Sequence, residues 1–333
     1  MKNRPRILFM GTPDFSVASL GALLMNGHNI CAVVTAPDKP SGRGRKLSPG
    51  PVKEFAGVSN LKVLQPVNLK ESAFLKELEE LSPDIIVVVA FRIIPEEVWS
   101  VASLGTFNLH ASLLPQYRGA APINHAIING ETETGVTTFL IDSGLDTGKI
   151  LFREKVNIFP TDNSEYLHER LMRKGAALVV KTVNALVSGT VTPLNQESFI
   201  SPGEQLKRAP KIFPDDCVID WKRDSVSLHN FVRGLAPAPA ARSYFGNIKG
   251  KEAVAFKLFE SNPETEEHPL EPGTVVVEGK KGLKVACGKG FLSIITLQLA
   301  GRKTVSAGEL LQGYDMSGTV ALSREMVLQE RGR

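Results

Sequence analysis

Two polar side chains two residues apart, Asn108 and His110, interrupt an apolar, strand-like run that begins at Thr106. Side chains alternate across a strand, so both are expected on one face, with Phe107 and Leu109 on the other. Polar groups at the end of a strand indicate a site, because burying them without partners is costly in free energy. The alternative is that both side chains form structural hydrogen bonds within a core.

A carboxylate follows the next predicted strand, which covers residues 135–141. Asp146 lies in the glycine-rich segment DSGLDTG, residues 142–148. On its own, such a carboxylate is explained equally well by the capping of a turn. Together with an amide and an imidazole it forms a set of groups that can hold and move protons, which favours catalysis.

The segment NLHASLLPQYRGAAP, residues 108–122, followed by GVTTFLIDSGLDTG, residues 135–148, resembles the folate-dependent formyltransferase family. The resemblance extends from Arg6 to about Leu311 and is strongest to the methionyl-tRNA branch of that family. It implies transfer of a formyl group from 10-formyltetrahydrofolate to the α-amino group of methionyl-initiator tRNA, for the initiation of translation. No metal is required by this chemistry.

The resemblance also implies roles for the polar trio. Asn108, His110 and Asp146 are then the catalytic residues. An oxyanion develops when the amine attacks the formyl carbon, and the Asn108 amide and a His110 ring N–H are suitable donors to it. Asp146 accepts the proton of the attacking nitrogen, directly or through water, or holds His110 in its productive form.

Two further segments are implied to bind the folate donor. One supplies apolar walls and a rigid turn, and the other supplies backbone groups for the pterin-like end of the folate. Their residues are Ser112, Leu113, Leu114 and Pro115 in the first segment and Arg92, Ile93 and Ile94 in the second. Residues 90–95 read AFRIIP, closer to the glycinamide ribonucleotide branch than to the AYGxILP form common in the methionyl-tRNA branch.

The length of 333 residues predicts about two domains, and 42% hydrophobic with 22% charged residues is typical of a soluble globular protein. No apolar run approaches the length of a membrane span, and the N-terminus fits a first strand better than a signal peptide. Three widely spaced cysteines disfavour a zinc site and a disulfide framework. A cytoplasmic monomer that does not associate with membranes is expected.

The net charge of +4 is too small to indicate a nucleic-acid-binding protein, but two basic clusters favour a polyanionic partner. Residues 274–303 contain six basic residues and one acidic residue. Residues 36–51 form a long Gly/Pro-rich segment, predicted to be a loop. The resemblance implies that this loop reaches the acceptor end of the tRNA through Arg43, Arg45 and Lys46. Each cluster alone could equally be a solvated surface.

The order of predicted elements indicates an α/β fold. A strand over 6–10, a helix ending at Met25 and a strand over 30–35 open a parallel, doubly wound, Rossmann-like sheet. A long helix is predicted from a cap at Thr161 or Asn163 to Leu186. Short strands from residue 209 onward predict a small OB-like β-barrel, in which Ala238 stands where the family often has tryptophan. We therefore expect a formyltransferase domain over 1–189, a linker over 190–208 and a tRNA-binding domain over 209–333.

Other functions remain open at this point. Within the family, the acceptor could be a nucleotide sugar or glycinamide ribonucleotide, and a formyl-folate hydrolase would use the same trio with water. A nicotinamide oxidoreductase is disfavoured because the first strand-to-helix turn holds Gly11 alone instead of GxGxxG. A non-catalytic RNA-binding module would leave the trio unexplained.

Overall fold

The chain forms two compact units in the computed structural model, which describes residues 4–41, 46–246, 253–322, 325 and 327. Neither unit is one continuous stretch of sequence. The first consists of Met1–Gly119, Glu133–Asn157 and His168–Arg208, and the second consists of Ala120–Thr132, Ile158–Leu167 and Ala209–Arg333.

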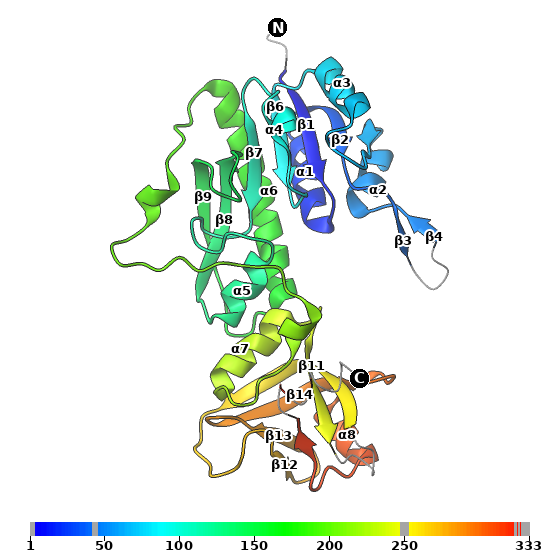
Figure 1. Ribbon diagram of the computed structural model, residues 1–333, viewed down its shortest axis with the longest axis vertical. Helices are drawn as coiled ribbons and strands as arrows, with labels where there is room; N and C mark the ends of the chain where they lie inside the picture. Colours follow the sequence, from blue (N-terminus) through cyan, green and yellow to red (C-terminus); the bar gives the residue numbers. More distant parts are fainter. Residues whose placement is uncertain (1–3, 42–45, 247–252, 323–324, 326, 328–333) are drawn as a thin grey trace. The chain divides into compact units, whose positions relative to one another are not determined.

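A seven-stranded sheet forms the centre of the first unit, in the order β5-β2-β1-β6-β7-β8-β9 (Figure 1). The first five strands in this order run parallel, and β8 and β9 continue the sheet antiparallel to their neighbours. This arrangement confirms the predicted Rossmann-like fold. The strands are β1 (Arg6–Gly11), β2 (Asn29–Val34), β5 (Val63–Leu64), β6 (Ile85–Val89), β7 (Thr106–His110), β8 (Glu133–Leu140) and β9 (Ile150–Asn157).

Helices bury both faces of this sheet, which is why its central strands are continuously apolar. All five residues of β6, IIVVV, are buried, as a strand covered on two sides requires. On one face, Ile86 and Val88 pack with residues of α3 and α4. The helices of the first unit are α1 (Asp14–Met25), α2 (Pro51–Val58), α3 (Ser72–Leu81), α4 (Glu96–Trp99) and most of α6 (Ser164–Ser188).

Helix α6 lies against the opposite face of β7 and β8. A Cβ atom on Gly175 would lie only 2.6 Å from Leu109 Cδ2, so the helix approaches β7 closely because glycine stands there. The Thr138 and Thr182 hydroxyls share a hydrogen bond of 2.8 Å between β8 and α6. At the start of the helix, Asn163 Oδ1 accepts the Tyr166 N–H at 2.9 Å. The predicted long helix with a cap at Asn163 is therefore confirmed.

The segment predicted as a loop over 36–51 contains two short paired strands, β3 (Lys39–Ser41) and β4 (Lys46–Ser48). Because β3 and β4 pair, their backbone N–H and C=O groups form hydrogen bonds with each other. In a loop without this pairing, the same groups would have to form hydrogen bonds with water. Arg43 and Arg45 lie outside the described residues, and Lys46 is the first residue of β4.

The second unit contains a small antiparallel barrel, as predicted. Its strands follow the order β12-β13-β14-β11-β10-β16, β15 pairs with β14, and a bridge between Thr274 and Val320 nearly closes the path. They are β10 (Ala241–Gly246), β11 (Ala253–Glu264), β12 (Val275–Glu278), β13 (Gly282–Ala286), β14 (Phe291–Leu299), β15 (Thr304–Ser306) and β16 (Val320–Ala321), accompanied by α5 (Pro122–Ile128), α7 (Ser225–Leu235) and α8 (Ala307–Gly313).

Trp221 lies in the core of this barrel, where its indole N–H donates to Ser243 Oγ at 3.1 Å. The rings of Phe245 and Phe256 stack in the same core. Ala238 is exposed on the segment that follows α7. Among the helices built from described residues, none has the length and apolar character needed to cross a membrane.

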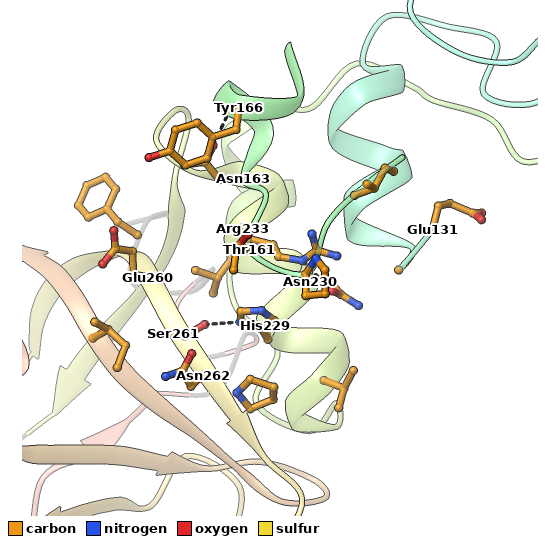
Figure 2. A pocket seen from close by; sticks show the side chains of 18 of the residues that line it. Glu131, Thr161, Asn163, Tyr166, His229, Asn230, Arg233, Glu260, Ser261 and Asn262 are labelled. Carbon is orange, nitrogen blue, oxygen red and sulfur yellow. Dashed lines mark hydrogen bonds between the residues drawn. The ribbon is translucent and has the colours of Figure 1, made fainter. Parts of the chain in front are cut away.

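The second unit also has a cavity of about 700 Å³ beside α7 and β11, shown in Figure 2. Several of its polar side chains form hydrogen bonds within the unit. Arg233 Nε donates to Asn230 Oδ1 at 2.8 Å, and Arg233 Nη1 donates to the carbonyl oxygens of Phe159 and Asp162. His229 Nδ1 lies 3.3 Å from Ser261 Oγ. Arg233 and His229 therefore have their hydrogen-bond partners within the second unit.

We expect His229 to make the folded state less stable at mildly acidic pH. Burial and then the neighbouring Arg233 guanidinium lower the pKa of His229 from its ordinary value of 6.5. As the pH falls, the unfolded chain therefore binds this proton before the folded chain does, and stability falls from about pH 6.5 down through the folded-state pKa. The loss is up to about 1.4 kcal/mol for each unit of lowering.

Urea unfolding of the whole chain at pH 7, 6 and 5 measures this effect. The free energy of unfolding should fall less steeply with pH in His229→Gln than in the unsubstituted protein. Equal slopes would show that His229 does not contribute.

Candidate active site

A cavity of about 470 Å³ lies in the first unit beyond the carboxyl ends of β6 and β7, where open α/β sheets bind their ligands. Its walls come from the ends of these strands, the segment that follows β6, and the loop that follows β8. The lining residues are Val88, Phe91, Arg92, Ile93, Ile94, Pro95, Glu96, Trp99, Asn108, Phe139, Ile141, Asp142, Ser143, Gly144, Leu145 and Asp146. Two of the three predicted catalytic residues, Asn108 and Asp146, are among them.

Asn108 reaches the cavity because of its register in the sheet. It pairs with Val88 of β6 and with Phe139 of β8, and all three residues line the cavity. The alternating neighbours Phe107 and Leu109 are buried in the core, as the sequence predicts. The half-buried Asn108 amide is thus held on a rigid strand beside an otherwise apolar wall.

His110 ends the same strand and is buried, with 6% of its surface exposed. Its Nε2 lies 2.8 Å from the carbonyl oxygen of Tyr117. A carbonyl oxygen can only accept a hydrogen bond, so Nε2 carries the proton and donates it. In the neutral ring, Nδ1 is then the acceptor nitrogen, and it lies 3.9 Å from Asp146 Oδ2.

The Asp146 carboxylate oxygen nearest His110, Oδ2, is also held by a backbone amide. This oxygen accepts the N–H of Gly119 at 2.9 Å. The residue has a φ of +53°, in the left-handed region that L-residues seldom occupy. Two residues on, a Cβ atom at Gly148 would lie 1.6 Å from the carbonyl oxygen of Leu140, so the loop requires glycine there. The carboxylate therefore sits at a defined point on a sharply folded loop.

Three residues predicted to bind folate line the cavity, namely Arg92, Ile93 and Ile94. Arg92 also has a structural contact, because its guanidinium donates to the carbonyl oxygens of Pro66 and Val67 at 2.6 and 2.7 Å. These bonds attach the segment after β6 to the segment after β5. Ile94 is buried, whereas Ile93 is largely exposed.

The other four predicted folate residues, Ser112 to Pro115, do not line this cavity. Ser112 is buried and donates to the carbonyl oxygen of Gln116 at 2.6 Å. The Leu113 side chain lies against Gly135, and Leu114 packs in a core with Phe139 and Ile150. The segment thus builds the turn between His110 and Tyr117 and supports the cavity wall from behind.

Several aromatic and aliphatic side chains of the cavity are absent from the sequence predictions. They are Phe91, Trp99, Phe139, Ile141 and Leu145. The apolar residues directly after the buried strand β6 were a usable signal, since ligands bind at carboxyl ends of parallel strands. The contribution of Phe139 depends on the register of β8 against β7, which the sequence alone does not determine.

Comparison with known proteins identifies two family models along the chain. Residues 5–183 match the model described as formyl transferase, and residues 211–315 match the model described as formyl transferase, C-terminal domain. Among curated relatives, the methionyl-tRNA formyltransferase of Bacteroides thetaiotaomicron is 51% identical over 94% of this chain and 96% of its own. That of Flavobacterium johnsoniae is 45% identical over 94% of this chain and 97% of its own.

Solved structures share the fold at lower sequence identity. An N-formyltransferase from Helicobacter canadensis, in complex with folinic acid and dTDP-3-aminofucose, has a TM-score of 0.61 at 22% identity, covering 86% of this chain and 97% of that one. HypX from Aquifex aeolicus, in complex with tetrahydrofolic acid, has a TM-score of 0.60 at 19% identity, covering 93% of this chain and 47% of that one.

Proposed function

The chain belongs to the formyl transferase family, and on that premise we propose that it transfers a formyl group from 10-formyltetrahydrofolate to the α-amino group of methionyl-initiator tRNA. Curated relatives named methionyl-tRNA formyltransferase, 45–51% identical over almost the whole chain, support this acceptor. The observation that carries the proposal is the approach of His110 and Asp146 beside a cavity that Asn108 also lines.

The cavity suits a flat heterocyclic donor. Phe91, Ile94, Trp99 and Ile141 provide apolar walls, while Asn108 and Asp146 are among the polar groups of the lining. A few polar groups in a mostly apolar cavity are the usual means of fixing a ligand's orientation. The reactive formyl group would then lie near these two side chains.

Asn108 is the donor that we assign to the developing oxyanion. When the amine attacks the formyl carbon, negative charge builds on the formyl oxygen, and a preorganised N–H stabilises it. In the present geometry the His110 Nε2–H is already donated to Tyr117, so of the two donors predicted for the oxyanion the Asn108 amide is the one that lines the cavity.

His110 and Asp146 handle the proton in this proposal. His110 Nδ1 accepts a proton from the attacking amine and passes it to N10 of the folate as the formyl carbon–N10 bond breaks. The products are the formylated amine and tetrahydrofolate, so atoms and charges balance. The Asp146 carboxylate, whose Oδ2 lies 3.9 Å from His110 Nδ1, stabilises the imidazolium formed in between by charge attraction.

The proposed acceptor places the protein in the cytoplasm, where aminoacyl-tRNA is present. Its cysteines agree with a reducing compartment, since Cys31, Cys217 and Cys287 are all free thiols. Arg43, Arg45 and Lys46 are proposed to contact the tRNA. The two guanidinium groups can bind phosphates with paired hydrogen bonds and stack on bases, and the Lys46 ammonium adds a positive charge.

The proposal is tested by transfer of labelled formyl from 10-formyltetrahydrofolate to charged initiator Met-tRNA, with elongator Met-tRNA alongside. We expect label in the initiator species. Folate turnover without labelled tRNA, or labelling of a nucleotide sugar or glycinamide ribonucleotide instead, would show that the acceptor is wrong.

Replacement of His110 by alanine or of Asp146 by asparagine should lower kcat by more than about a hundredfold, because each removes a group that moves or stabilises the proton. Single-turnover transfer to initiator Met-tRNA measures the loss. His125→Ala is a matched control, because this histidine belongs to the second unit and does not line the cavity. Its ring Nε2 lies 3.0 Å from the Pro210 carbonyl oxygen, and wild-type turnover is expected. Wild-type turnover in either test variant would contradict the assigned roles.

Arg43→Ala should raise the KM for Met-tRNA several-fold, since it removes a phosphate ligand, while folate binding stays unchanged. Steady-state kinetics with each substrate varied separates the two effects. Lys62→Ala, which removes a cation paired with Glu77 on the first unit, serves as the charge-matched control. A KM for tRNA equal to that of the control would remove Arg43 from the proposed interface.

A further inference from the structure

Residues 194–208, far along the chain, contact two parts of the candidate active site from outside its cavity, within the first unit. Leu194 pairs with Ile150, the first residue of β9 after the Asp146 loop, through two backbone hydrogen bonds. Lys207 accepts the Tyr117 N–H at its carbonyl oxygen, and its own N–H donates to Gln116 Oε1. The segment therefore contacts both the Asp146 loop and the turn that supplies Tyr117 and Gly119.

The side chain of Gln196, in this segment, joins those two parts directly. It is 1% exposed. Its Nε2 donates to the carbonyl oxygens of Asp146 and Gly148 at 2.8 and 2.9 Å. Its Oε1 accepts from Nε and Nη2 of Arg118 at 3.1 and 2.7 Å. The amide thus uses both donors and both lone pairs.

Arg118 determines which way the Gln196 amide faces. A guanidinium can only donate, so the amide oxygen has to face Arg118. The NH₂ group is thereby directed at the two carbonyl oxygens of the loop, which can only accept. A half-turn of the amide would oppose donors to donors and acceptors to acceptors, so this buried amide has a single favourable orientation.

These bonds close a ring of contacts around Asp146. Gly119, which follows Arg118, donates its N–H to the Asp146 carboxylate at 2.9 Å. Gln196 Nε2 donates to the backbone carbonyl oxygen of the same residue. Asp146 has a left-handed φ of +53°, and its surroundings have to hold that conformation against relaxation. The distance between its carboxylate and His110 Nδ1 depends on that backbone.

We infer that Gln196 is a positioning residue for Asp146, and that Arg118 acts through Gln196 by orienting its amide. This inference rests on the proposed function, because it concerns the placement of the proposed catalytic carboxylate. Gln196 holds the loop so that the Asp146 carboxylate faces His110, without itself lining the cavity.

Gln196→Glu isolates this role. A carboxylate still accepts from Arg118, so the half-buried guanidinium keeps its partner. The two donors to the loop are lost, and the new oxygens face the carbonyls of Asp146 and Gly148. We expect kcat for formyl transfer to fall about ten- to a hundredfold, the scale of a displacement near 1 Å. Gln205→Glu, the same change at an exposed residue of the same segment, should keep wild-type kcat.

The decisive comparison repeats the change in the Asp146→Asn background. If Gln196 acts through Asp146, then Gln196→Glu should cost less than about twofold there, because residues that act as a unit lose their effect together. An equal loss in both backgrounds, or no loss in the first, overturns the inference. Arg118→Lys keeps the charge but loses the paired bonds, and it supplies a milder second test of the same coupling if Gln196→Glu does not fold.

The two proposals fail in distinguishable ways. Normal turnover in Asp146→Asn alone contradicts the proposed catalytic role of the carboxylate. A hundredfold loss in Asp146→Asn combined with normal turnover in Gln196→Glu and Arg118→Lys contradicts only the positioning role. The pH dependence of kcat should also change in Gln196→Glu and stay unchanged in Gln205→Glu. A smaller fraction of folded protein would lower kcat equally at every pH, so it would not produce the change in Gln196→Glu.

Discussion

The hydrogen bond from His110 Nε2 to the Tyr117 carbonyl is the interaction on which the site depends. It fixes the ring of a buried histidine and decides which nitrogen carries the proton. Because Nε2 is used in this way, Nδ1 is turned toward Asp146. The turn between residues 110 and 117 must therefore bring the Tyr117 carbonyl oxygen back within hydrogen-bond distance of His110 Nε2. The buried residues Ser112, Leu114 and Pro115 make this turn rigid.

Each group of the site is held by a partner from another part of the sequence. Asn108 and His110 lie on β7. The Asp146 carboxylate accepts a hydrogen bond from the Gly119 amide, and the Asp146 carbonyl oxygen accepts one from Gln196 Nε2. Strands position side chains more rigidly than loops do, so the loop residue needs the larger number of external contacts. The concentration of buried hydrogen bonds around Asp146 follows from its place on a loop.

Much of the fold was predictable from local pattern. The alternation at Asn108 and His110 placed both side chains on one face of a strand, and the apolar run of β6 predicted a strand buried on both sides. The contributions of Gln196 and Leu113 were not predictable in this way. The hydrogen bonds of the Gln196 side chain to Asp146 and Gly148 span 48 or more residues and leave no periodic signal in the sequence. The position of the Leu113 side chain depends on space beside Gly135 that only the folded sheet defines.

The first turn of the sheet explains why a Rossmann-like topology here serves a different chemistry. In dinucleotide-binding proteins a glycine-rich turn leaves room for a pyrophosphate at the helix N-terminus. Here a Cβ atom on Gly11 would lie 2.6 Å from Ser16 Cβ, and the buried Ser16 hydroxyl donates to the Val89 carbonyl at 2.7 Å. The helix start is thus packed against the end of β6. The cavity lies on the other side of that strand end, next to β7, where Asn108 and His110 provide the polar groups.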